Sequence, residues 1–82
     1  MKGVLSKEIT EETKKIFQAS KIFCGLGKSK IIYDGDSVHV GSLSYEIRRN
    51  DGNFEIYYLQ PDLDKVDGFS RRFVEAMPVE SI

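Results

Sequence analysis

The first hydrophobic positions of the chain recur every three or four residues, the spacing typical of one face of a helix. They are Leu5, Ile9, Thr13, Ile16, Phe17, Ser20, Phe23 and Cys24. We therefore expect a helix from about Ser6 or Glu8 to Phe23. Gly25 follows as a typical C-terminal residue, because glycine adopts the conformation that ends helices. Cys24 lies at the edge of this apolar stripe, so we expect it to be buried.

Three turn signals divide the next part of the chain: Asp34-Gly35, Gly41-Ser42 and Asp51-Gly52. Glycine beside Asp or Ser supplies the positive φ that two-residue hairpin turns require. Hydrophobic and polar residues alternate between these turns, as in strands with one buried face. The pattern predicts a four-stranded antiparallel meander over residues 30–60.

The turns also predict the pairing of the strands, because a shift by one residue would move every side chain to the opposite face. The first turn places Ile31 opposite Val38, and the last places Ile47 opposite Ile56. All three turns collect the same apolar residues on one face, namely Ile31, Tyr33, Val38, Val40, Leu43, Tyr45, Ile47, Phe54, Ile56 and Tyr58. This agreement is the strongest indication of the meander.

A second apolar stripe at helical spacing follows the meander. It consists of Leu63, Val66, Phe69, Phe73, Val74 and Met77. We expect a second helix from about Asp62 or Asp64 to Met77, which Pro78 would end. The expected fold is an α+β domain covering residues 1–82 in the order α-β-β-β-β-α, with both helices on the apolar face of the sheet.

Composition restricts the function classes only broadly. The 82 residues contain one cysteine, which excludes an internal disulfide, and no apolar run near the length of about 20 residues that spans a bilayer. We therefore expect a cytoplasmic protein. Two alanines against eight isoleucines and eight lysines suit an AT-rich genome, such as that of a phage or another mobile element.

Short motifs in the chain do not match known catalytic, cofactor or metal sites. Gly25–Ser29 resembles a phosphate-binding loop, but a strand should precede that loop and a helix should follow it. Asp62, Asp64 and Asp67 do not have the spacing of a calcium-binding EF-hand. A single cysteine and a single histidine cannot form a structural zinc site within one chain. We expect no enzyme activity, no cofactor and no metal.

The second face of the predicted sheet is the leading candidate for a contact surface. A sheet with both helices on one side leaves its other side open to water. Ile32, His39, Tyr57 and Leu59 lie on this side with Arg48, Glu46 and Glu55, and Arg48 faces Glu55 in the arrangement of a surface ion pair. Apolar residues rimmed by charge are typical of protein contacts.

We therefore expect a small protein-binding module, either a homodimer or an inhibitor or adaptor of a larger protein. Its contact residues would be Ile32, His39, Arg48, Tyr57 and Leu59.

An alternative function is nucleic-acid binding through the lysines of the N-terminal part. Residues 1–30 carry a net charge of +4, whereas residues 31–82 carry −5. Lys14, Lys21, Lys28 and Lys30 would contact phosphates, and aromatic residues on the open sheet face would stack on bases. The overall charge of −1 argues against a protein dedicated to nucleic acids.

Overall fold

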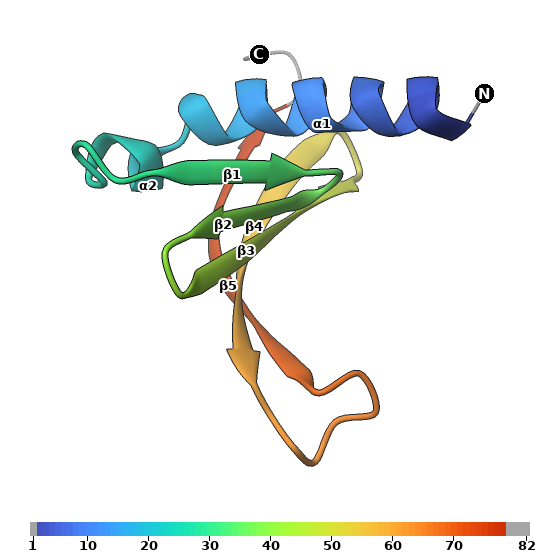
Figure 1. Cartoon of the computed structure of the whole chain (residues 1–82), viewed down its shortest axis with the longest axis vertical. Coiled ribbons are helices and arrows are strands. Elements are labelled where there is room, and N and C mark those ends of the chain that lie inside the picture. The colour runs from blue at the N-terminus through green and yellow to red at the C-terminus, as the bar shows by residue number, and fades with distance from the viewer. Residues whose placement is uncertain (1, 79–82) are drawn as a thin grey trace.

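The structure, a computed structural model, describes residues 2–78 of the chain (Figure 1). Within this range the elements are α1 (Lys2–Gln18), α2 (Lys21–Cys24), β1 (Ile31–Asp34), β2 (Ser37–Val40), β3 (Leu43–Asn50), β4 (Asn53–Pro61) and β5 (Phe69–Pro78). The strands form one antiparallel sheet in the order β1-β2-β3-β4-β5. The predicted α+β class with an antiparallel meander is confirmed, and the meander has one strand more than expected.

The helix predicted over about 62–77 is wrong, because Phe69–Pro78 forms strand β5. This strand pairs with β4, for example at Leu59 and Arg71. Gly68, with a φ of 76°, leads into it from the turn. The expected second helix on the sheet face is therefore absent from the described residues, and α1 and α2 are the only helices in residues 2–78.

The N-terminal helix also differs from the prediction. α1 begins earlier, at Lys2, and ends at Gln18, after which Ser20 starts the separate helix α2. The Ser20 hydroxyl oxygen accepts a hydrogen bond from the Phe23 amide at 3.2 Å and donates one to the Phe17 carbonyl. A buried serine thus satisfies backbone groups of both helices, which favours the break over a continuous helix.

The predicted pairings of β2 with β3 and of β3 with β4 are confirmed, and Ile47 lies opposite Ile56. Asp51 and Gly52 have φ values of 50° and 77°, the signs that a type I′ turn requires. The first hairpin differs, because Ile31 lies opposite Val40 and not opposite Val38. Its turn is centred one residue later than predicted, so the partners change while the side chains keep their faces.

The core lies between α1 and the sheet face that α1 covers, which we call the inner face. Its buried hydrophobic residues are Ile16, Phe17, Val38, Val40, Ile47, Phe54 and Ile56. The ring of Phe17 contacts the rings of Phe23, Tyr33 and Tyr45, with centroids 5.7–6.3 Å apart. Leu43, expected on the apolar face, is exposed, and Cys24, expected to be buried, is also exposed.

Polar contacts fix α1 at one end of the sheet. The Gly35 amide donates to the Thr10 hydroxyl at 2.9 Å, and Arg49 forms an ion pair with Glu12 at 3.1 Å. Figure 1 shows α1 across one end of the sheet while β4 and β5 run away from it. No helix in residues 2–78 is long and apolar enough to cross a membrane.

The β4–β5 hairpin therefore has two parts, divided where its pairing shifts between Ile56 and Tyr57. Phe54 and Ile56 lie in the part near α1 and are buried. In the far part, which we call the arm (residues 57–73), no residue is buried. The outer end of the arm is a turn, Asp62–Gly68, which we call the tip.

Candidate contact surface

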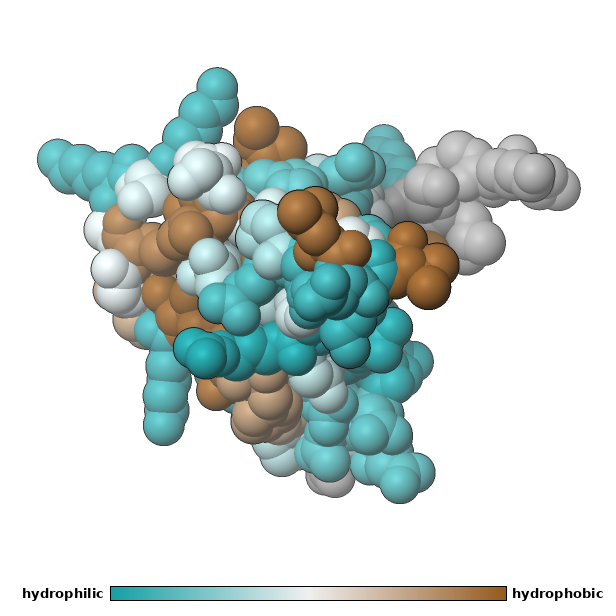
Figure 2. All heavy atoms as spheres, turned by 90° about the horizontal axis from the view of Figure 1, so that it is seen from below, coloured by the Kyte–Doolittle hydropathy of each residue, from teal (hydrophilic) through white to brown (hydrophobic). Residues whose placement is uncertain are grey.

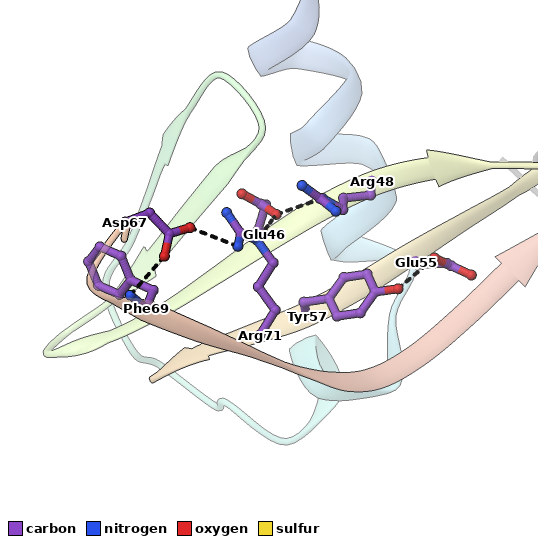
Figure 3. Close-up of polar contacts among 7 residues, drawn as sticks. All are labelled: Glu46, Arg48, Glu55, Tyr57, Asp67, Phe69 and Arg71. Atoms are coloured by element: carbon purple, nitrogen blue, oxygen red, sulfur yellow. Dashed lines mark hydrogen bonds and ion pairs between the residues drawn. The ribbon is translucent and has the colours of Figure 1, made fainter. Parts of the chain in front are cut away.

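The sheet face opposite α1, which we call the outer face, carries all five predicted contact residues. Ile32 lies opposite His39 on the neighbouring strand. Ser44 of β3 lies between His39 and Leu59 and pairs with both, so these residues form one row across the sheet. Tyr57 lies two residues before Leu59 on β4 and so faces the same side. Arg48 lies two residues after Glu46, the partner of Tyr57, and so faces the same side, and Figure 3 shows it beside Glu46. The structure thus brings these residues onto one surface that neither helix covers.

Strand β5 adds three residues to this surface that sequence reasoning missed. Phe69, Arg71 and Phe73 alternate along the strand and pair with Pro61, Leu59 and Tyr57. The helical spacing of the apolar residues in this region predicts a helix, although the spacing of two between Phe69, Arg71 and Phe73 also fits a strand. The rings of Tyr57 and Phe73 meet edge to face, with centroids 5.8 Å apart.

Three of the hydrophobic side chains on the outer face are strongly exposed. Ile32 and Phe73 each keep 54% of their surface accessible, and Phe69 keeps 43%. Val74, at the irregular pairing of β5, is exposed as well. Single exposed hydrophobic residues are ordinary, but several on one uncovered sheet face form a surface suited to protein contact.

A network of charged side chains borders these hydrophobic residues (Figure 3). One carboxylate oxygen of Glu46 accepts from Nε of Arg48 at 2.9 Å and from Nε of Arg71 at 2.8 Å. Arg71 also pairs with Asp67 of the tip at 2.9 Å. The ion pair expected between Arg48 and Glu55 is replaced by this network.

Glu55 instead accepts a hydrogen bond from the Tyr57 hydroxyl at 2.7 Å. This bond raises the pKa of Tyr57, since loss of the proton would place two negative charges side by side. The hydrogen bond to Glu46, followed by that to Asp67, raises the pKa of Arg71. At neutral pH the outer face therefore presents a protonated phenol and an ion-pair network whose charges balance within the chain.

The tip is ordered by its own aspartates. The Asp62 amide donates to the Gly68 carbonyl at 2.8 Å, and the Asp64 amide donates to the Asp62 side chain at 3.0 Å. The Ser70 hydroxyl also donates to Asp62 and is the main cause of that residue's lowered pKa. The Phe69 amide lowers the pKa of Asp67 in the same way, with Arg71 adding to the effect. These bonds hold the turn in one conformation.

The cysteine and the histidine lie on different elements. Cys24 is exposed on α2, whereas His39 is half-buried on the outer face with Nδ1 3.0 Å from the Ser44 hydroxyl. Among residues 2–78, no group of three or more His, Cys, Asp or Glu side chains is arranged to hold a metal ion.

The four lysines of the nucleic-acid alternative are all exposed. Lys14 lies on α1, Lys21 on α2, and Lys28 and Lys30 in the loop before β1. Since α1 covers the inner face, Lys14 and the outer-face aromatic residues lie on different sides of the sheet. A single strand of nucleic acid lying across the outer face would therefore not contact Lys14.

Neither a protein-family model, nor a curated protein sequence, nor a solved structure matches this chain.

Proposed function

We propose that this protein is a non-enzymatic binding module that attaches to another protein through its outer face, as an inhibitor or adaptor does. One observation carries the proposal: the aromatic and aliphatic side chains of β4 and β5 lie on a sheet face that α1 and α2 leave uncovered. Burying such residues against a partner removes apolar surface from water, the main favourable contribution to protein association.

The chemistry of the outer face supports this proposal. Tyr57, Phe69 and Phe73 are aromatic, and Arg48 and Arg71 lie beside them. Aromatic residues and arginine are the types that most often dominate the affinity of protein interfaces.

The ion-pair network reduces the cost of forming such a contact. Glu46 already holds both arginines, and Arg71 holds Asp67. A partner therefore need not supply opposite charges for these groups, but the exposed N–H groups of Arg48 and Arg71 must keep water or polar partners when the contact forms. Because the side chains are held in place before binding, less conformational freedom is lost on association.

The proposal can be tested by comparing three immobilised proteins as baits in an extract of the native host. The test variant is Phe69→Thr/Phe73→Thr, because both side chains are exposed and threonine favours strands. The matched control is Ile9→Gln, which removes an exposed hydrophobic residue from α1. We expect a protein that binds the wild type and the control but not the test variant. If every retained protein also binds the test variant, the outer face is not the contact surface.

The nucleic-acid alternative is tested with the purified wild-type protein and one further variant. Lys14→Glu/Lys21→Glu removes two of its proposed phosphate contacts without altering the outer face. We expect binding to RNA and DNA oligonucleotides no tighter than the non-specific range of about 10⁻⁴–10⁻⁶ M. A sub-micromolar complex that weakens with salt and is lost in this variant would favour the alternative.

A further inference from the structure

The tip presents two aliphatic side chains to water in an ordered turn. Leu63 and Val66 have relative accessibilities of 99% and 110%, so neither contacts the rest of the chain appreciably. The hydrogen bonds of Asp62 nevertheless connect the two ends of the turn. Figure 2 views the molecule from this end and shows apolar side chains standing among polar ones. The core does not need these two residues, which makes them available for a contact.

A second feature lies near the turn between β2 and β3, far from the tip (Figure 1). The loop before β1 and the turn between β2 and β3 enclose an open depression of about 490 Å³. Its hydrophobic lining comes from Leu26, Val40 and Leu43, and Lys30 and Ser29 stand at its edge. Leu43 is exposed here although Val40, its partner on the neighbouring strand, is buried. The depression therefore offers apolar surface beside a positive charge.

The charges of the two features are opposite. The tip contains three aspartates and one lysine, and because Arg71 neutralises Asp67, its remaining negative charge comes from Asp62 and Asp64. Residues 13–33, which include one wall of the depression, contain five lysines and no acidic residue. An acidic turn with protruding aliphatic side chains thus matches an apolar depression with a basic border.

We propose that the tip of one copy inserts into the depression lined by Leu26, Val40 and Leu43 of a second copy, so that the protein associates head to tail. Leu63 and Val66 would cover the apolar floor, and Asp64 would approach Lys30, which lines the depression, and Lys28 of the same loop. Figure 1 shows the tip well apart from the β2–β3 turn of the same molecule, so the contact would form between copies. Unlike the proposed function, this association uses neither Tyr57 nor Phe73.

Head-to-tail association has a distinctive consequence. After pairing, one copy still has a free depression and the other still has a free tip, so further copies can add until a ring closes. The assembly would display several outer faces together, which would strengthen binding to a partner with repeated sites.

Sedimentation velocity on nuclease-treated protein tests this inference. We expect the average mass of the wild type to rise between about 10 µM and about 1 mM protein, and to fall when salt screens the charges. The tip variant Leu63→Ser/Val66→Ser and the border variant Lys28→Glu/Lys30→Glu should each remain monomeric. Their side chains are exposed, so neither variant should disturb the fold. Phe73→Thr and Lys14→Glu/Lys15→Glu, the matched controls, should associate like the wild type.

Mixing the two monomeric variants gives the decisive result. The tip variant retains an intact depression and the border variant retains an intact tip, so one productive contact remains. We therefore expect a 1:1 heterodimer that does not grow further. A wild type that stays monomeric at about 1 mM would overturn the inference. So would a mixture that stays monomeric, or an association that Phe73→Thr abolishes.

Discussion

The two parts of the β4–β5 hairpin differ in what holds them, although the same two strands run through both. Near α1, Phe54 and Ile56 are buried in the core. In the arm, where no residue is buried, the strands rely on backbone pairing, the contact of Tyr57 with Phe73, and the Glu46 network. The near part therefore supplies stability, while the side chains of the arm are free to form a contact surface.

The largest expected effect comes from the core. Phe17→Ala removes a fully buried ring, and such changes cost about 3–5 kcal/mol. Phe73→Ala, in the arm, should cost less than about 1 kcal/mol because the ring is already half exposed. Urea denaturation monitored by circular dichroism measures both. If Phe17→Ala does not fold, Ile56→Val, with an expected loss of about 0.5–1.5 kcal/mol, replaces it. Equal losses from Phe17→Ala and Phe73→Ala would mean that the core does not hold the fold more strongly than the arm does.

The turn next to the core gives the second effect. Gly52→Val places a β-branched residue at a φ of 77°, which should cost about 1–3 kcal/mol in unfolding free energy. Gly25→Ala is the control, because Gly25 has a φ of −88° and its added carbon would meet only ordinary contacts. An unchanged urea midpoint for Gly52→Val would mean that this turn does not set the pairing of β3 with β4.

A smaller effect is expected when the arm loses its ionic attachment. Glu46→Gln removes the charge that holds Arg48 and Arg71, and surface pairs of this kind contribute at most about 1 kcal/mol. Amide hydrogen exchange should accelerate at Tyr58 and Leu59, while the rate at Ile56 should change no more than the global stability does. Uniform acceleration along β4 would show that the two parts open together.

The smallest effect concerns the acid side of the pH range. The folded-state pKa values of Asp62 and Asp67 lie below 3.8, so their contribution is present above that pH and is lost as pH falls through the lowered values. We expect the amide resonances of Asp64 and Phe69 to shift with midpoints below 3.8 while the core resonances stay native. Asp67→Asn should abolish the titration at Phe69. A midpoint above 3.8 would mean that the turn does not stabilise the carboxylates.

The same division separates what the sequence could predict from what it could not. The pairing of β3 with β4 follows from residues at one turn, Asp51 and Gly52, whose conformational needs are local. The spacing of Phe69, Phe73 and Met77 suits a helix as well as a strand. Pairing with the open edge of β4 selects the strand over the helix. The spacing within residues 69–77 carries no information on that edge, so it predicted the wrong element.

The candidate surface could be predicted only in part. Ile32, His39, Arg48, Tyr57 and Leu59 could be placed on one face because strand alternation assigns faces even when partners shift. The first hairpin shows this, since its turn lies one residue later than predicted and the faces are unchanged. The contribution of β5 and the exposed tip could not be predicted, because both depend on β5, whose sequence pattern predicts a helix.

The most direct test of the account compares affinity and stability in the same samples. The partner captured with the wild type is purified, and its Kd is measured by isothermal titration calorimetry for the wild type, Ile9→Gln and Phe69→Thr/Phe73→Thr. Urea unfolding is measured on each protein. We expect a Kd at least about tenfold weaker for the double variant, or about 1.4 kcal/mol, with little change in unfolding free energy. An unchanged Kd, or a loss of affinity explained by a matching loss of stability, would contradict it.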